Sequence, residues 1–176
     1  HFHDYGLVSG ILAPVIAGAP GYLMSPVAFL RRPLRWLEAV ATHRITHTGA
    51  PVWAFAACLQ ALGDKALGVR LDSLVSLTCG AEPIRAATVE GVLSVFGAAG
   101  LRPTAFAPSY GLAEAVLGVS SSMLDAPPRI VSADVSALLA HRFEPASDAS
   151  REVRRLVGCG RAMADTEILG VHAGRP

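Results

Sequence analysis

Residues 74–97, which read LVSLTCGAEPIRAATVEGVLSVFG, decide the fold. The apolar run 74–79 has the length and composition of a buried strand, and it stops at Gly80. Pro83 suits the first position of a helix, because its missing N–H would have no partner there. Four apolar residues of that helix share one face: Val89, Val92, Leu93 and Phe96. The stretch therefore predicts a strand, a short connection and an amphipathic helix.

Helix-like and strand-like patterns alternate on both sides of this stretch. Upstream we expect a buried helix over 7–17, a buried strand over 21–24, helices over 33–42 and 51–62, and a strand over 45–48. Downstream we expect a strand over 104–107, a turn at Tyr110 and Gly111, and a short helix over 112–119. The alternation predicts an α/β fold, in which βαβ units build a mostly parallel sheet with flanking helices.

The pattern changes after residue 124. Strand-like runs there cover residues 129–131, 137–140, 153–157 and 166–171, around a polar loop at 144–150 and before a turn at 174–176. Their spacing favours a smaller, more antiparallel region. We therefore divide the chain into an α/β part, residues 1–124, and a β-rich continuation of the same domain, residues 125–176.

The composition is unusually apolar for a chain of 176 residues. Apolar residues make up 52% and charged residues 16%, with a mean hydropathy of +0.44, whereas ordinary domains have about 25% charged residues. A membrane protein would explain this, but prolines and glycines interrupt the apolar stretch 6–24 and a spanning helix needs about 20 apolar residues in a row. We therefore expect no transmembrane segment, and a piece of a larger domain whose apolar faces are covered elsewhere.

Charge and cysteine content restrict the partners and the compartment. The net charge is +1 and the arginines are scattered, so no basic stripe predicts nucleic-acid binding. The three cysteines are widely spaced and form no C-x-x-C pair. This usage fits a reducing, cytoplasmic compartment without structural disulfides or zinc.

The pentapeptide Tyr110-Gly111-Leu112-Ala113-Glu114 follows a predicted strand and is expected to begin a helix. An aromatic ring at a strand end can stack on a purine, and glycine lets the backbone approach a ligand closely. Glu114 could hold Mg²⁺, which prefers one or two carboxylates together with phosphate oxygens. The alternative is a tight turn with a core tyrosine and a glutamate favoured by the helix dipole, and the pentapeptide alone favours that alternative.

Two further motifs are open to a functional and a structural interpretation. Gly80-Ala81-Glu82-Pro83 lies where a parallel strand ends, which is where α/β proteins bind ligands, but an ordinary connection would look the same. His3 with Asp4 is an acid/base pair or a surface histidine. A metal site with His1 is disfavoured, because no other His or Cys group has ligand spacing. The sequence has neither a G-x-S-x-G hydrolase elbow nor a G-x-x-x-x-G-K-[ST] phosphate loop.

Taken in order, the motifs resemble those of fatty acyl-AMP ligases, a branch of the adenylate-forming superfamily. His3-Asp4-Tyr5-Gly6-Leu7 is similar to the HDMGL segment of that family, with Tyr5 where Met is usual. The stretches that follow in family order are 24–37, 49–51, 80–85, 110–115, 159–161 and 166–169. Arg-Pro-Leu-Arg-Trp-Leu at 32–37 and Gly-Ala-Glu-Pro at 80–83 favour this branch over ordinary acyl-CoA synthetases.

The resemblance implies a role for individual residues. ATP or AMP would be bound by Gly80, Ala81, Glu82, Pro83, Ser109, Tyr110, Gly111, Leu112 and Ala113, with the Tyr110 ring on adenine. His3 and Glu114 would be the catalytic residues, and Glu114 would also help to bind Mg²⁺. The fatty acyl chain would lie near Gly49, Ala50 and Trp53.

The resemblance also implies a reaction, and it implies that some residues needed for that reaction lie outside this chain. A fatty acid would be activated with ATP and Mg²⁺ to an acyl-adenylate and passed to an acyl carrier protein in lipid or polyketide synthesis. The phosphate loop, the ribose-binding aspartate and the C-terminal lysine of the family are expected outside residues 1–176, so the isolated chain should be inactive. Two alternatives remain open: an acyl-CoA synthetase that uses coenzyme A, and a truncated, non-catalytic interaction module.

Overall fold

The computed structural model describes residues 3–122 and 124–170. The helices are α1 (Asp4–Leu7), α2 (Ala13–Ala17), α3 (Pro26–Arg31), α4 (Leu34–Thr42), α5 (Val52–Leu62), α6 (Ala86–Ala98) and α7 (Val135–Leu139), with a π-helical turn at Val8–Leu12 and 3₁₀ turns at Pro103–Ala105 and Ala113–Ala115. The strands are β1 (His47–Pro51), β2 (Ser76–Gly80), β3 (Phe106–Leu112), β4 (Leu117–Ser121), β5 (Ile130–Asp134), β6 (Val153–Val157) and β7 (Arg161–Ala162).

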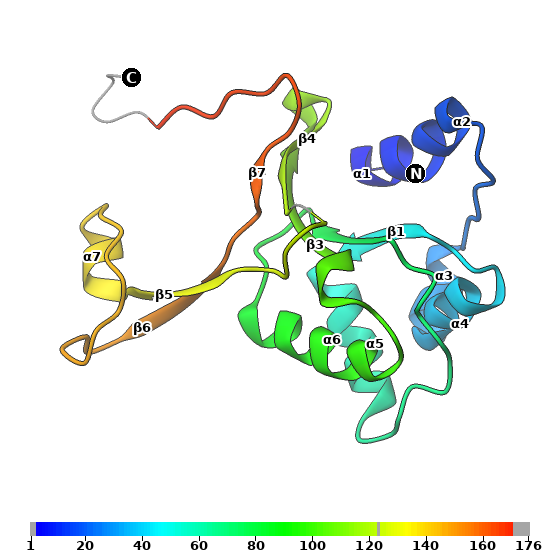
Figure 1. Ribbon diagram of the computed structural model, residues 1–176, viewed down its shortest axis with the longest axis horizontal. Coiled ribbons are helices and arrows are strands. Elements are labelled where there is room, and N and C mark those ends of the chain that lie inside the picture. Colours follow the sequence, from blue (N-terminus) through cyan, green and yellow to red (C-terminus); the bar gives the residue numbers. More distant parts are fainter. Residues whose placement is uncertain (1–2, 123, 171–176) are drawn as a thin grey trace.

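The main sheet has five strands in the order β1-β2-β3-β4-β7. The first three strands are parallel, while β4 and β7 are antiparallel to their neighbours. Helices α5 and α6 make the crossovers of β1-α5-β2-α6-β3 and pack against each other below the sheet, whereas α1 and α2 lie on its other side (Figure 1). The α/β fold class and the mostly parallel sheet are therefore confirmed.

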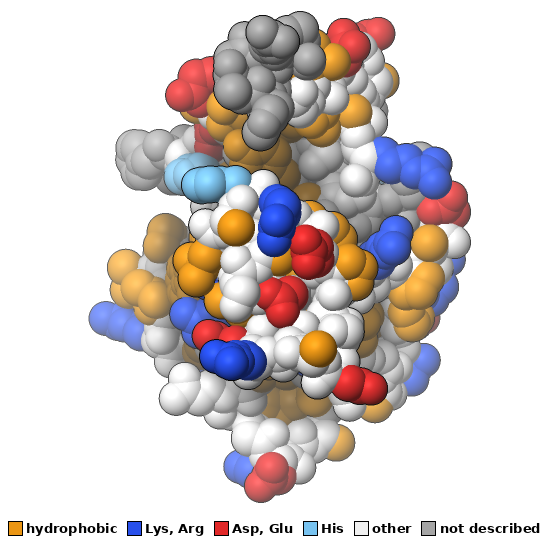
Figure 2. All heavy atoms as spheres, turned by 90° about the vertical axis from the view of Figure 1, so that its left-hand side faces the viewer, with side chains coloured by type: hydrophobic (Ala, Val, Ile, Leu, Met, Phe, Trp, Pro, Cys, Tyr) orange, Lys and Arg blue, Asp and Glu red, His pale blue; other side chains and the backbone are white. Residues whose placement is uncertain are grey.

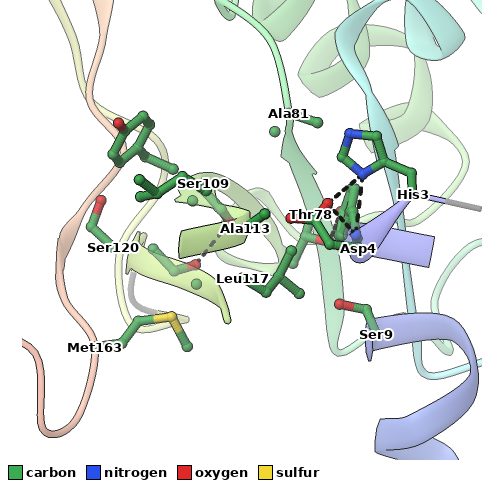
Figure 3. A pocket seen from close by; sticks show the side chains of 17 residues that line it. His3, Asp4, Ser9, Thr78, Ala81, Ser109, Ala113, Leu117, Ser120 and Met163 are labelled. Atoms are coloured by element: carbon green, nitrogen blue, oxygen red, sulfur yellow. Dashed lines mark hydrogen bonds and ion pairs between the residues drawn. The ribbon is translucent and has the colours of Figure 1, made fainter. Parts of the chain in front are cut away.

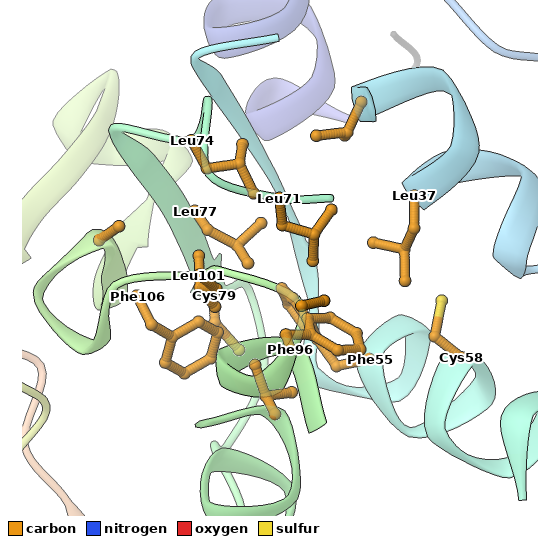
Figure 4. Packing of buried hydrophobic residues seen from close by; sticks show 14 of the residues in the cluster. Leu37, Phe55, Cys58, Leu71, Leu74, Leu77, Cys79, Phe96, Leu101 and Phe106 are labelled. Atoms are coloured by element: carbon orange, nitrogen blue, oxygen red, sulfur yellow. The ribbon is translucent and has the colours of Figure 1, made fainter. Parts of the chain in front are cut away.

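The hydrophobic core lies between the parallel strands and α4, α5 and α6. Leu77 and Cys79 of β2 lie in the core (Figure 4). Side chains alternate along a strand, so Thr78 points to the opposite face, where it meets Tyr5. Phe55 of α5 packs edge-on against Phe106 of β3, with ring centroids 5.4 Å apart. Such aromatic pairs add to the stability that apolar burial provides. The core therefore fixes β2 and β3 rigidly below the face that carries Thr78.

A two-stranded ribbon, β5 with β6, extends away from the main sheet and carries α7 near its tip (Figure 1). Arg155 of β6 forms two hydrogen bonds with the carboxylate of Glu90 on α6, at 2.9 and 2.5 Å. These bonds from Arg155 lower the pKa of Glu90. The face in Figure 2 shows acidic and basic side chains interspersed over this end of the molecule.

Several predicted elements are confirmed. The expected helix 51–62 is α5, which ends where Gly63 takes the positive φ of 58° that glycine accommodates. The expected helix 33–42 is α4, with Leu37 and Val40 buried. Strand β6 has the predicted bounds 153–157. The predicted strands at 45–48 and 74–79 are displaced by one to three residues toward the C-terminus, as β1 and β2.

The predicted helix 112–119 is wrong. Residues 113–115 form a single 3₁₀ turn, and β4 then returns antiparallel to β3. Tyr110 and Gly111 lie within β3, at a register irregularity, instead of forming the turn. The local helical preference of Ala113 and Ala115 is overridden because the strand pairing satisfies the backbone of the whole hairpin.

Other local predictions fail for identifiable reasons. Residues 21–24 form no strand and are mostly exposed. Residues 137–140 belong mainly to α7 rather than to a strand, because the Asp134 carboxylate accepts a hydrogen bond from the Ala137 N–H at 2.8 Å and caps that helix. Helix α6 begins at Ala86, not at Pro83, because residues 81–85 form an irregular connection.

The two ends of the chain also differ from expectation. The segment 7–17 is helical, but none of its residues is buried, and Val15 and Ile16 are 73% and 84% exposed. Residues 166–170 form no strand. Val171 and the expected turn at 174–176 lie outside the described residues.

Candidate functional site

A cavity of about 550 Å³ opens at the carboxyl ends of β2 and β3. One wall comes from α1 and the turn that follows it, the other from the β3–β4 hairpin, and the end of β2 lies between them (Figure 3). The lining residues are His3, Asp4, Tyr5, Ser9, Thr78, Gly80, Ala81, Ser109, Tyr110, Gly111, Leu112, Ala113, Leu117, Gly118, Ser120, Ser121 and Met163. This is the position at which parallel α/β sheets bind ligands.

The end of β2 brings bare backbone to the cavity. A Cβ on Gly80 would lie 2.9 Å from the carbonyl oxygen of Ser109, so only glycine allows β2 and β3 to approach this closely. Ala81 follows with a φ of 65°, a left-handed conformation that is uncommon for alanine. Such backbone outliers cluster at ligand sites, which supports the assignment of this loop to the cavity.

The β3–β4 hairpin presents an aromatic ring and hydroxyl groups. Tyr110 is 54% exposed although it lies inside a strand, so its ring is free to stack on a planar ligand. The Ser109 and Ser121 hydroxyls are 3.0 Å apart and join the two strands. A Cβ on Gly111 would overlap the Leu117 carbonyl. The two strands of the hairpin can approach this closely only because residue 111 is glycine.

His3 and Asp4 lie at the opposite wall. The Nδ1 atom of His3 is 2.5 Å from an Asp4 carboxylate oxygen, and both groups accept from the Tyr5 N–H at the start of α1. The His3 side chain is 69% exposed, so its ring remains accessible from the cavity. Because Nδ1 accepts from the Tyr5 N–H, the neutral ring has its proton on Nε2, which is the atom able to donate to a ligand.

Tyr5 closes the site on the side of β1. Its hydroxyl forms a short hydrogen bond with the Thr78 hydroxyl, and a Cβ on Gly49 would overlap both groups. Burial of the Tyr5 side chain raises its pKa to about 12, and the hydrogen bond with Thr78 opposes that rise only partly. The phenol therefore stays protonated over the whole neutral range.

Three residues predicted for the nucleotide or metal lie outside the cavity lining. The Glu82 carboxylate accepts a hydrogen bond from the Trp53 N–H at 2.8 Å, so it caps the N-terminus of α5. Pro83 is exposed in the connection to α6, and Glu114 is exposed on the 3₁₀ turn next to Ala113. These three residues could therefore contact a nucleotide or a metal ion only through their backbone, or where the ligand extends beyond the cavity lining.

The residues predicted for the acyl chain do not converge. Gly49 faces Tyr5 and Thr78, whereas Ala50 packs toward the core on the other face of the sheet. Trp53 lies at the start of α5, with its ring 5.6 Å from that of Phe29, and lines a smaller hollow together with Glu82.

The structure adds residues that the motifs alone did not point to. They are Tyr5, Ser9, Thr78, Leu117, Gly118, Ser120, Ser121 and Met163. Half of them come from β4, whose first residues overlap the helix predicted over 112–119. Met163 contacts Gly118, where a side chain on residue 118 would displace its sulfur. The small residues along 117–122 were the available signal for a strand that lines a cavity.

Within residues 3–122 and 124–170, no group of three or more His, Cys, Asp or Glu side chains is placed to hold a metal ion. Over the same ranges, each helix is too short or too polar to cross a bilayer.

The fold and the cavity define an α/β protein that binds its ligand at the carboxyl ends of parallel strands. The sequence profile of the family described as "AMP-binding enzyme" matches residues 1–169. The chain therefore belongs to the AMP-binding, adenylate-forming enzyme family, and its relatives within that family are fatty acyl-AMP ligases.

Individual relatives make this similarity concrete. The chain is 40% identical over 175 residues to the medium-chain-fatty-acid–[acyl-carrier-protein] ligase JamA of Moorena producens. The aligned residues are 98% of this chain and 30% of JamA. The chain is also 40% identical over 145 residues to the long-chain-fatty-acid–AMP ligase FadD26 of Mycobacterium tuberculosis, covering 82% of this chain and 25% of that protein.

A solved structure has the same fold. The fatty acyl-adenylate ligase of L. pneumophila, in complex with acyl adenylate and pyrophosphate, superposes with a TM-score of 0.83 at 34% identity, over 91% of this chain and 28% of that one. The chain thus spans about a quarter to a third of the length of the relatives that it matches.

Proposed function

We propose that this chain forms the nucleotide- and acid-binding centre of a fatty acyl-AMP ligase, which activates a fatty acid with ATP. One observation carries the proposal. Two segments distant in sequence, His3 and the run 109–113, line a single cavity together with Gly80 and Ala81. These are the residues that the family motifs assign to the phosphates and to the nucleotide.

The cavity walls suit an adenine nucleotide. The half-exposed Tyr110 ring offers a face for the base, and stacking of this kind contributes about 1–3 kcal/mol per base. The backbone at Gly80 and Ala81 lies at the same end of the sheet, where no bulky side chain separates it from a ligand. Nucleotide and protein can therefore approach closely on both sides of the ring.

The reaction needs positioning and charge neutralisation more than covalent chemistry. A carboxylate oxygen of the acid attacks the α-phosphorus of ATP, and the bond from that phosphorus to the bridging oxygen breaks as pyrophosphate leaves. His3 lies across the cavity from the hairpin, where its ring can donate a hydrogen bond to the carboxylate or phosphate oxygens. The Tyr5 N–H, which donates to Nδ1, holds the ring in place.

Mg²⁺ is the proposed companion of ATP. It supplies neutralisation of phosphate charge and usually takes one or two protein carboxylates, with phosphate oxygens and waters completing its shell. Glu114 fits that role because it is exposed directly beside Ala113, which lines the cavity. The Glu114 carboxylate would then hold the ion at the edge of the site.

The proposed acyl acceptor is an acyl carrier protein. JamA is named as a ligase that uses such a carrier, and the identity to JamA spans nearly the whole chain. Transfer to coenzyme A is the alternative. Its product would be an acyl-CoA instead of an acylated carrier protein, and an assay can separate the two.

ATP–pyrophosphate exchange with a panel of fatty acids tests the proposal. We expect the full natural protein to exchange and Glu114→Ala to lose most of that activity, whereas Glu144→Ala, on the distant β5–β6 ribbon, should match the wild type. The present chain alone should be inactive. If the folded natural protein shows no exchange with any acid, the non-catalytic interaction module becomes the better explanation. Addition of holo-carrier protein or of coenzyme A then identifies the acceptor.

A further inference from the structure

The cavity ends abruptly beside β1. Its described lining comes from α1 and the following turn, β2, β3, β4 and Met163, and includes no residue of β1. The Tyr5 side chain stands at this border, because its hydroxyl is hydrogen-bonded to Thr78 and lies over Gly49. Gly49 and Thr78 are register partners on adjacent parallel strands, so one phenol covers the same face of both strands.

Tyr5 is held in this position from several sides. The absence of a side chain at Gly49 creates the space that the hydroxyl fills, since a Cβ there would overlap the Tyr5 and Thr78 oxygens. The side chain is half-buried, and the backbone N–H of Tyr5 is bound at the start of α1. A side chain fixed by a hydrogen bond, by close packing and by its helix forms a wall and not a mobile flap.

The position of this wall makes it important for the acid. It stands where the cavity lining of this chain ends on the side of β1. A tail whose carboxylate lies near His3 and which runs along β2 toward β1 meets the Tyr5 hydroxyl above Thr78. Relatives include ligases named for medium-chain and for long-chain acids, so family membership leaves the chain length open.

We propose that Tyr5, anchored on Thr78 above Gly49, sets the upper limit on the length of the acyl chain and makes this protein selective for short and medium fatty acids. The inference rests on the proposed function, because it concerns the acid that the same site would activate. Tyr5 acts here as a specificity-determining residue and takes no part in the bond changes.

The test compares octanoate, dodecanoate and hexadecanoate in ATP–pyrophosphate exchange by the full natural protein. Tyr5→Met removes the rigid ring and the hydroxyl but keeps a flexible apolar side chain. We expect it to raise the ratio of kcat/KM for hexadecanoate over octanoate by about tenfold or more, since a few methylenes in an apolar pocket change selectivity by that order. Tyr5→Phe keeps the ring and loses only the anchor, and should raise the ratio about threefold.

The matched control is Tyr22→Met, because Tyr22 is half exposed and stacks on His43 away from the cavity. It should keep the wild-type ratio. Wild-type exchange with an unchanged ratio in Tyr5→Met and Tyr5→Phe would overturn the inference alone. No wild-type exchange with any acid would overturn the proposed function instead. If Tyr5→Met fails to fold, as shown by circular dichroism, the Tyr5→Phe ratio decides.

Discussion

The cavity wall that β2 and β3 supply rests on a buried core, whereas no side chain of the wall that residues 3–17 supply is fully buried. Phe55, Leu77 and Phe106 are fully enclosed behind the first wall, while Val15 and Ile16 of α2 point into solvent. Positions on the first wall should therefore be fixed by packing. Positions on the second wall depend on a few local contacts, above all those of Tyr5 with Thr78.

The largest effect should come from the core behind the first wall. Phe55→Ala removes a fully buried ring that packs on Phe106 and should lower the free energy of unfolding by about 3–5 kcal/mol. Val15→Ala on α2 should change it by less than about 0.5 kcal/mol. Urea denaturation followed by circular dichroism measures both, and similar losses in the two variants would refute the contrast between the walls.

Replacing a glycine by alanine should likewise cost more stability in the first wall than in residues 3–17. A Cβ on Gly111 overlaps the Leu117 carbonyl, so Gly111→Ala must shift backbone and should cost about 1–3 kcal/mol. Gly10, in the π-helical turn, has open space around it, and Gly10→Ala should be neutral or stabilise by about 0.5–1 kcal/mol. Denaturation midpoints compare the two. A harmless Gly111→Ala would mean that the hairpin is looser than its register implies.

Substitution of Tyr110 tests whether the wall that β2 and β3 supply binds the nucleotide. Tyr110→Ala in the full natural protein should weaken ATP binding about tenfold, because it removes the stacking face. Tyr22→Ala should leave the affinity unchanged, since Tyr22 lies on His43 outside the cavity. Isothermal titration calorimetry measures both affinities. Equal affinities in wild type and Tyr110→Ala would place the base elsewhere.

The smallest effect concerns Tyr5, in the wall that residues 3–17 supply, at high pH. Burial raises the pKa of Tyr5 to about 12 from 10.0, so above about pH 10 the unfolded chain loses this proton while the folded chain keeps it. The stability that Tyr5 contributes is thus complete below about pH 10 and is lost as the pH rises through about 12. Buried Cys58 and Cys79, whose pKa values are also raised to about 12 by burial, lose stability in the same direction from about pH 9.

Comparison with Tyr5→Phe isolates the tyrosine. Between about pH 8 and pH 10.5, the Tyr5→Phe variant should lose about 1 kcal/mol less stability than the wild type, because only the cysteine contributions remain. Urea denaturation under reducing conditions at both pH values gives the difference. Parallel losses in the two proteins would show that the Tyr5 hydroxyl is solvated in the folded state.

The sequence predicted the strand and helices of the core better than the β3–β4 hairpin and the contacts of Tyr5. Strand β2, helix α5 and the apolar face of α4 follow from periodicity because burial enforces it. The β3–β4 hairpin did not follow, since its short local pattern favours a helix and the pairing that overrides it is not local. The motifs pointed to His3 and to residues 109–113, which line one cavity in the structure. Periodicity could not show that Tyr5 and Thr78, 73 residues apart in the sequence, form a hydrogen bond.

The Glu82 contact shows how a motif residue can serve a site without lining it. Its carboxylate binds the first turn of α5, and it follows Ala81, whose left-handed backbone lies in the cavity. The side chain thus ties the loop after β2 to the helix after β1. The short motif marks the loop that follows β2, but the direction of this side chain depends on the neighbouring crossover.

Met163 gives the cavity a built-in spectroscopic label. The chain has three methionines, and the sulfur of this one lies against Gly118 in the hairpin wall. In a sample with ¹³C-labelled methionine methyl groups, its resonance would shift when a nucleotide enters, while that of Met24, outside the lining, would serve as an internal reference. Ligand entry could then be followed by NMR without any added dye or engineered residue.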